Sequence, residues 1–192
     1  KICKMISYQY SKRILKKAII KIKDENIKSI NSLNRVVSKN IYSPINYPSG
    51  DNAAFDGYAV NSRDTKNIKK NSAKKFKIIG LIAAGNKPFN KKIKKFDAVE
   101  IMTGGIIPKG FDTIIPIEKI VFYPNNNIKR YILIDQKLKK HNHVRFAGSD
   151  FKKRELVVKK STFIQPNHIL SFKTLGIKNI TVKKKINILF FS

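Results

Sequence analysis

The sequence predicts a multidomain α+β protein with helical segments near both ends and a mainly β unit between them. Apolar residues recur at helical spacing near the N-terminus and again after residue 165. Between residues 56 and 140, short segments rich in β-branched and aromatic residues alternate with Gly, Pro, Asn or Lys, as in all-β units. The 192 residues, of which 42% are hydrophobic, are enough to bury a core, so disorder is not expected.

The N-terminal part is expected to begin with an amphipathic helix over residues 8–22, with Ser7 as its N-cap. Five apolar residues at helical spacing predict it, namely Ile14, Leu15, Ala18, Ile19 and Ile22. A weaker apolar pattern over residues 27–41 indicates a turn, a helical segment and then a strand. The segment "SPINYPSG" follows, and its prolines and glycine mark a boundary.

The central part is expected to form a small all-β unit. The strands are predicted in "DGYAV", "KFKIIGLIAAG", "DAVEIMTGG", "DTIIPIEKIVFY" and "RYILID". A hairpin connection is predicted in "YPNNNIKRY", where one proline and three asparagines separate two such segments.

The C-terminal part is expected to contain a strand and turn in "ELVVKKSTFI" and a helix in "QPNHILSFKTLG". Pro166 suits the first turn of that helix and Gly176 its C-terminal cap. Two strands are predicted in "NITVKKKINILFFS", and the second is almost continuously apolar, as in a buried strand of a parallel sheet. We therefore expect this strand to open a further α/β domain, and the chain to be truncated there.

The charge balance is strongly basic, with 41 Lys and Arg against 12 Asp and Glu and a net charge of +29. Such a balance suggests nucleic acid, an anionic membrane surface or an anionic ligand. The lysines, however, occur in pairs and triplets throughout and accompany many Ile and Asn residues, which is typical of compositional drift. A solvated surface is therefore favoured over a nucleic-acid footprint.

Two further features limit the class of protein. The apolar runs are far shorter than the ~20 residues that span a bilayer, so no membrane association is expected. The one cysteine, Cys3, excludes an intrachain disulfide and a multi-cysteine zinc site, and it fits a reducing cytoplasm.

Two segments carry candidate chemistry in glycine-rich surroundings. Asp51, Asp56 and Asp64 lie in "PSGDNAAFDGYAVNSRD", where a carboxylate could bind a metal or act as a general base, or form a turn or cap. Thr103 precedes Gly104 in "IMTGG", where backbone N–H groups could approach an oxyanion, or where a strand could simply end in a glycine turn.

A third candidate segment is "HNHVRFAGSD". His141 and His143 would share one face of a strand, but two histidines without a third ligand are a weak zinc signal. Arg145, close to a glycine turn, suits bidentate binding of phosphate or carboxylate, and the alternative is an ion pair with Asp150.

Taken in order, four stretches resemble the motifs of the molybdopterin molybdenumtransferase family, which includes MoeA and the gephyrin E domain. They are "SPINYPSGDNAAFDGYAV", "AAG", "VEIMTGGIIPKGFDTIIPIE" and "HVRFAGSD". The resemblance extends over nearly the whole chain. It implies insertion of molybdate into adenylylated molybdopterin with release of AMP, in the presence of Mg²⁺.

The resemblance also implies a modular organisation. Residues 1–43 and 141–182 would form one elongated, discontinuous α/β domain, residues 44–140 an inserted mainly β domain, and residues 183–192 the first strand of a truncated α/β molybdopterin-binding domain. The family's cleft lies between the β domain and the third domain of the dimer partner. The full-length protein would be a cytoplasmic homodimer, and this chain alone is expected to be inactive.

Site residues follow from the same resemblance. It implies catalytic roles for Asp56 and Thr103, and Asp56 would also be the Mg²⁺ ligand. The residues implied in substrate binding are Asp51, Asn52, Gly57, Gly104, Arg145 and Asp150. Glu100 and Ser149 depart from the family pattern, which has Arg and Glu at those positions.

Partners remain open at this stage. An enzyme of the molybdopterin adenylyltransferase type would supply the adenylylated substrate. The alternative function is that of a non-catalytic basic protein that binds nucleic acid or another polyanion, favoured if binding is tight and steeply salt-dependent.

Overall fold

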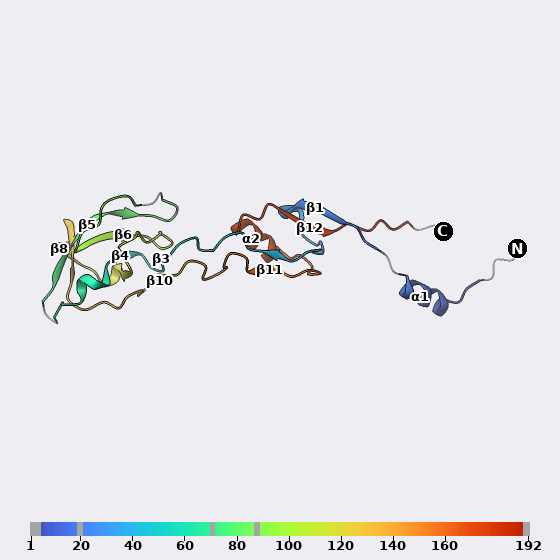
Figure 1. Ribbon diagram of the computed structural model, residues 1–192, viewed down its shortest axis with the longest axis horizontal. Coiled ribbons are helices and arrows are strands. Elements are labelled where there is room, and N and C mark those ends of the chain that lie inside the picture. Colours follow the sequence, from blue (N-terminus) through green and yellow to red (C-terminus); the bar gives the residue numbers. More distant parts are fainter. Residues whose placement is uncertain (1–4, 19–20, 70–71, 87–88, 190–192) are drawn as a thin grey trace. The chain divides into compact units, whose positions relative to one another are not determined.

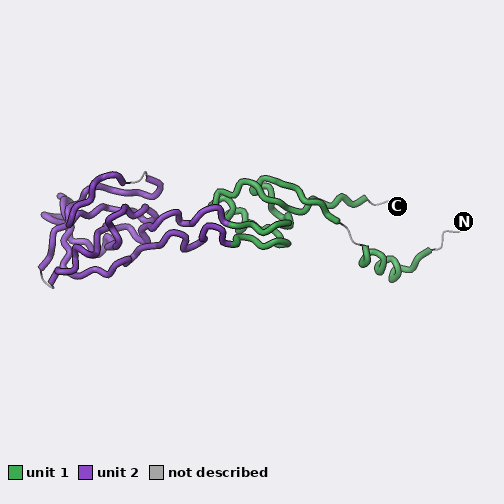
Figure 2. The backbone as a smooth tube through the Cα atoms, in the orientation of Figure 1, with its two compact units in different colours: residues 1–42, 156–192 green, residues 43–155 purple. Residues whose placement is uncertain are grey.

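The computed structural model describes residues 5–18, 21–69, 72–86 and 89–189. The chain divides into two compact units, residues 1–42 with 156–192 and residues 43–155 (Figure 2). The chain passes from the first unit to the second at residues 42–43. It returns at residues 155–156. Residues 141–155 hydrogen-bond back to the start of the second unit: the Arg154 N–H donates to Ser43 O at 2.8 Å and the Asp150 N–H to Tyr47 O at 3.0 Å.

The unit of residues 43–155 is built on a six-stranded mixed sheet with the order β7-β4-β6-β5-β9-β8 (Figure 1). Its strands are β4 (Gly57–Val60), β5 (Lys74–Ile82), β6 (Asp97–Ile101), β7 (Thr113–Pro116), β8 (Val121–Pro124) and β9 (Lys129–Ile134). Only β5 and β6 are parallel. The strands overlap the predicted segments to within one residue at their ends, and the hairpin between β8 and β9 is confirmed by the pairing of Tyr123 with Tyr131.

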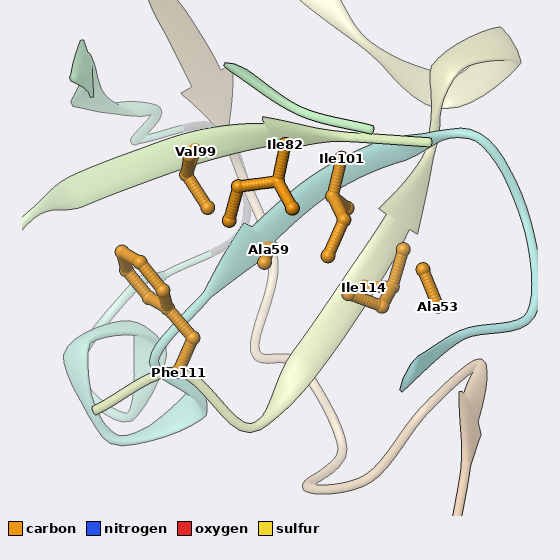
Figure 3. Close-up of a cluster of buried hydrophobic side chains, with 7 residues drawn as sticks. All are labelled: Ala53, Ala59, Ile82, Val99, Ile101, Phe111 and Ile114. Carbon is orange, nitrogen blue, oxygen red and sulfur yellow. The ribbon is translucent and has the colours of Figure 1, made fainter. Parts of the chain in front are cut away.

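The core of this unit lies on both faces of the sheet. All four residues of β4 are buried, and they alternate between two clusters. Ala59 belongs to the cluster drawn in Figure 3, with Ala53, Ile82, Val99, Ile101, Phe111 and Ile114. Tyr58 and Val60 belong to the opposite cluster, with Phe76 and Ile132. The period-two alternation of a strand therefore accounts for both clusters.

Besides the helix α1 (Tyr8–Lys17), the other unit contains two short antiparallel pairs and a second helix. β1 (Asp24–Lys28) pairs with β12 (Asn179–Lys183), and β2 (Ile41–Tyr42) pairs with β11 (Leu156–Val158). The helix α2 (Pro166–Thr174) buries Phe172 in a cluster with Val37, Val158, Ile164, Ile180 and Val182. Between residues 27 and 41 the only regular helical turn is a 3-10 turn, Ser29–Asn31, which follows β1.

The caps of α2 agree with the sequence. Pro166 occupies the first turn, as predicted. Leu175 is the C-cap, and Gly176 follows it with a φ of +69°, so that its N–H donates to Lys173 O at 3.1 Å. Gly176 therefore lies one position beyond the predicted cap. The left-handed conformation at this position suits glycine, because a side chain would be strained there.

Two predictions at the ends of the chain are corrected. Ser7 is confirmed as the N-cap of α1 (Tyr8–Lys17), but the helix ends at Lys17 instead of residue 22, because Ala18 is extended and β1 begins at Asp24. Residues 184–189 form no strand, since no described strand pairs with them, and the rest of that predicted strand lies outside the described residues. Among the described helices, none has the length and apolar character of a membrane span.

Candidate functional site

A central segment, residues 51–57, lies between two loops of the same unit, residues 102–107 and 143–150. It contains the short strand β3 (Asn52–Ala53), which pairs with β10 (Val144–Arg145) (Figure 1). On one side the Ala53 N–H donates to Gly105 O at 3.0 Å and the Gly104 N–H donates to Ala53 O at 2.9 Å. On the other side the Ala54 N–H donates to His143 O at 3.0 Å. Backbone hydrogen bonds thus join three of the motifs found in the sequence.

Asp56 and Thr103 are in direct contact within this assembly. Both the hydroxyl and the backbone N–H of Thr103 donate to Asp56 Oδ1 at 2.6 Å. These two bonds, the hydroxyl first, lower the pKa of Asp56 from its ordinary value. Asp56 is exposed, and within the described part of the chain its Oδ2 accepts no hydrogen bond. The site therefore presents an ionised carboxylate with one oxygen fixed and the other open to solvent.

Local backbone geometry explains why the contact forms. Thr103 follows the end of β6 and precedes Gly104, whose φ is +80°. That left-handed conformation suits glycine, and it turns the chain so that Gly104 can donate to Ala53. The glycine turn predicted from "IMTGG" is confirmed, and it places the Thr103 donors beside the start of β4.

Substitution of Thr103 by Val should raise the pKa of Asp56 toward its ordinary value. The substitution removes the hydroxyl hydrogen bond, which lowers that pKa more than the backbone hydrogen bond does. The shift can be measured by following the Asp56 carboxyl carbon in an NMR titration. Thr103→Ser, which keeps the hydroxyl, should restore the low pKa. An unchanged Asp56 pKa in Thr103→Val would contradict the assignment of the shift to this bond.

A second carboxylate, Asp51, holds the neighbouring loop. Its Oδ1 accepts a hydrogen bond from the Ala147 N–H at 2.9 Å. In the same loop Arg145 Nη2 bonds to Asp150 Oδ2, and the Ser149 hydroxyl donates to Asp150 Oδ1 at 3.3 Å. The ion pair considered in the sequence is therefore present. The Arg145 and Asp150 side chains are 49% and 34% exposed, so the pair remains accessible to a ligand.

Two other predicted site residues are buried. Asn52 is 6% exposed, and its Oδ1 accepts no hydrogen bond within the described residues. Gly57 is buried in β4, where the backbone of β7 approaches it closely. Asn52 thus leaves a polar atom unsatisfied near the motif, which usually requires a partner. The structure gives Gly57 a packing role.

The histidines do not share a strand face, so that interpretation was wrong. His141 and His143 lie in a turn and have φ values of +64° and +55°. His143 packs edge-on against Phe55 and His141 against Phe146, with ring centroids 5.0 and 5.1 Å apart. Both rings therefore help to pack the motif loops.

Metal binding by the protein alone has little support. Over the described ranges, no group of three or more His, Cys, Asp or Glu side chains comes together as a metal site. Mg²⁺ commonly uses one or two carboxylates together with waters and substrate phosphates, so a single carboxylate is compatible with it. The open Oδ2 of Asp56 fits an ion shared with a phosphate-bearing ligand.

Glu100, which the sequence comparison above singled out, lies on the opposite face of the sheet from its neighbour Ile101. It pairs with Tyr58 across β4 and β6, and neighbouring residues in a strand point to opposite faces. Burial and the negative charge of Glu100 raise the pKa of Tyr58 to about 12. Glu100 therefore acts on the face that carries Tyr58, opposite the face that carries Ile101.

Sequence reasoning missed the main-chain groups of this site. The N–H groups of Thr103, Gly104 and Ala147 and the carbonyl of His143 join the three segments. Main-chain groups have no residue signature. The sequence shows only the glycines and aspartates that accompany them.

Comparison with known proteins supports the motif assignment. The family model described as MoeA N-terminal region (domain I and II) matches residues 6–176. Molybdopterin molybdenumtransferase of Haemophilus influenzae is 32% identical over 155 residues, which are 81% of this chain and 36% of that protein. The enzyme of the same name from Bacillus subtilis is 28% identical over 154 residues, 80% of this chain and 35% of its own length.

A solved structure agrees with the fold. The molybdopterin biosynthesis MoeA protein of Pyrococcus horikoshii superposes with a TM-score of 0.79 at 28% identity, over 95% of this chain and 45% of that one. This chain spans about a third of the length of the curated relatives that it matches. Because the family model, the ordered motifs and the fold agree, the chain belongs to the MoeA family and contains its N-terminal region.

Proposed function

We propose that this chain serves in molybdenum cofactor biosynthesis, in the insertion of molybdate into adenylylated molybdopterin with release of AMP. The observation that carries the proposal is the Asp56–Thr103 contact, formed where the family's motifs meet. Relatives named molybdopterin molybdenumtransferase support the reaction. The relatives are longer than this chain, so a further region would complete the activity.

Thr103 is assigned a positioning role. A threonine hydroxyl has one proton to donate, and that proton is given to Asp56 Oδ1. The same hydroxyl cannot at that moment donate to an oxyanion. Thr103 therefore fixes the direction of the carboxylate and leaves Oδ2 for a ligand.

Asp56 is assigned the role of Mg²⁺ ligand. A carboxylate and molybdate repel each other, so direct binding of the oxyanion by Asp56 is unfavourable. When bound, Mg²⁺ would neutralise charge on the pyrophosphate and on the incoming oxyanion. The carboxylate then needs a fixed direction and an accessible oxygen, and Asp56 has both.

Arg145 is assigned to the phosphate groups of the substrate. A guanidinium has five N–H donors, and the bond to Asp150 uses one nitrogen. The half-exposed side chain can therefore keep this ion pair and still donate to a phosphate. Asp51 would maintain the loop that carries it, through the Ala147 N–H. Asn52 and the Gly104 turn would complete the substrate-binding wall.

Three further proposals follow from family membership. The active form would be a cytoplasmic homodimer, with a region beyond this chain completing the cleft. The adenylylated substrate would come from an enzyme of the molybdopterin adenylyltransferase type. Nucleic acid is not a proposed partner.

The function can be tested with a chimaera in which the 192 residues replace the matching N-terminal region of the Haemophilus influenzae relative. The chimaera should release AMP from adenylylated molybdopterin in a molybdate- and Mg²⁺-dependent reaction. The native relative serves as the reference for rate. The C-terminal region of the relative, produced without any N-terminal region, should be inactive, because it lacks a carboxylate in the position of Asp56.

Folding must be separated from chemistry in this test. A chimaera that shows the circular dichroism and dimeric mass of the relative, yet releases no AMP, would contradict the proposed function. Release of AMP that does not depend on molybdate would contradict the assigned reaction.

A further inference from the structure

A cavity of about 440 Å³ lined by lysines lies at the end of β4 away from Asp56. Its walls include Lys91, Lys94, Lys95 and Lys109, together with Asn61 and Asp64. Asp56 precedes the four-residue strand β4 and Asn61 follows it. At about 3.3 Å per residue the two sites are separated by the length of that strand.

The carboxylates around this cavity are bonded to groups other than lysine ammonium groups. Asp64 Oδ2 accepts from the Phe96 N–H at 3.0 Å, and Asp97 Oδ2 accepts from the Lys94 N–H at 2.7 Å. Asp112 accepts from the Ser62 N–H at 2.7 Å and from its hydroxyl at 2.9 Å. These bonds fix the walls of the cavity, and each carboxylate keeps its negative charge. Asp97 and Asp112 lie behind the wall, so among the three only Asp64 lines the cavity itself.

The four lysines differ in how far their ammonium groups are engaged. Lys91 Nζ donates to Ile79 O at 2.6 Å, and Lys95 Nζ lies 5.0 Å from the centroid of the Phe96 ring. For Lys94 and Lys109, no hydrogen bond or ion pair of the ammonium group is present among the described residues. Four cations thus line one space against a single carboxylate, Asp64, and their mutual repulsion would be relieved by an anion.

We propose that this cavity binds an anion that carries a chain of phosphates. A single phosphate would balance only part of the charge of four ammonium groups, whereas a triphosphate carries several negative charges along its length. Lysines bind phosphate as point charges without a fixed planar geometry, which suits a flexible chain. The volume lies within the range of about 300–1,000 Å³ found for small-molecule sites.

This inference is independent of the molybdate reaction, because it uses no residue of the Asp56 site. The four cavity lysines are exposed, like many other lysines of the chain, and what sets them apart is that they line one space together. Lys159 and Lys160, for example, are exposed in the other unit and line none of the described pockets that this chain forms. Those two lysines therefore provide a matched control of equal charge.

The experiment is calorimetric titration of the 192-residue chain with inorganic triphosphate at about 0.15 M salt, where the Debye length is about 8 Å. One triphosphate should bind per chain. The pair Lys94→Gln and Lys109→Gln should weaken binding at least tenfold. The control pair Lys159→Gln and Lys160→Gln should change it less than twofold, and so should Arg145→Gln, which lies in the other site.

Three results of this titration would overturn the proposal. One is an equal loss of triphosphate affinity in the cavity pair and the control pair, which would indicate non-specific surface charge. Another is a loss of triphosphate affinity in Arg145→Gln alone, which would place the anion at the Asp56 site. Absence of saturable binding to the unsubstituted chain would also overturn it.

A second titration distinguishes the sources of the phosphate chain. ATP that competes with triphosphate at equal affinity would support recognition of the phosphate chain alone. Tighter binding of ATP, still dependent on Lys94 and Lys109, would support a nucleotide ligand. Single-stranded RNA is the last titrant. If the cavity pair and the control pair reduce its affinity equally, and triphosphate does not compete with it for the chain, binding follows general charge and the proposal is overturned.

Discussion

Substitution of Asp56 by Asn should reduce the rate of AMP release by the chimaera at least a hundredfold, about 2.7 kcal/mol of transition-state stabilisation. The asparagine Oδ1 can still accept both hydrogen bonds from Thr103, so the geometry at that oxygen is preserved. What is lost is the negative charge at the open oxygen. The measurement is kcat and KM for molybdate over a range of Mg²⁺ concentrations.

The control for this experiment removes a carboxylate elsewhere in the same unit. Asp135 follows β9, is exposed and carries no assigned role, so Asp135→Asn should leave turnover within twofold of the parent. Full activity of Asp56→Asn at limiting molybdate and Mg²⁺ would refute the role of the carboxylate. Equal losses in the two variants would indicate a general effect of charge.

Substitution of Gly57 by Ala should lower the free energy of unfolding by about 3 kcal/mol, the upper part of the range for overpacking. A Cβ at this position would lie 2.0 Å from the backbone oxygen of Ile115 and 2.9 Å from its carbonyl carbon. These are backbone atoms of β7, so relief requires the two paired strands to separate. Equilibrium unfolding in urea measures the change.

Gly50→Ala is the matched control for this prediction. Its Cβ would lie 3.4 Å from the Ile106 side chain, an ordinary contact, so stability should change by less than about 1 kcal/mol. Equal stabilities of the two variants would show that β7 moves freely to admit the methyl group. Because Gly57 adjoins Asp56, its loss should also disturb the site before the unit unfolds.

The sequence predicted the strands of the second unit well, because their signals are local. β-branched runs between Gly, Pro and Asn mark them, and β4 to β9 overlap the predicted segments to within one residue at their ends. The segment predicted as one strand from Asp112 to Tyr123 is divided into β7 and β8 by a 3-10 turn, Ile117–Lys119. The helix α2 was equally well marked, since Pro166 and the glycine after its cap act locally. The order of the sheet, with β6 between β4 and β5, has no such local signal.

Other features could not be predicted because they depend on distant partners. The end of α1 is set where the chain becomes extended to reach β1, whose partner β12 lies more than 150 residues away. The return crossing near residue 155 depends on hydrogen bonds to Ser43 and Tyr47.

The sequence suggested residues for the candidate site, but it did not indicate the hydrogen bonds between them. Asp56 and Thr103 were chosen from motifs, and the structure brings them into contact. Arg145 was assigned a ligand role with an ion pair as the alternative, and the ion pair with Asp150 is present. The burial of Asn52 could not be foreseen, because an isolated Asn beside Asp is ordinarily an exposed turn residue.

The backbone bonds around residues 51–57 bear on how this protein tolerates sequence change. Mutation replaces side chains, but every residue except proline keeps its N–H and carbonyl. The frame that orients Asp56 is built from such groups at Ala53, Ala54, Gly104 and Gly105. Exposed side chains of this segment, such as that of Ala54, can therefore change while the carboxylate keeps its direction.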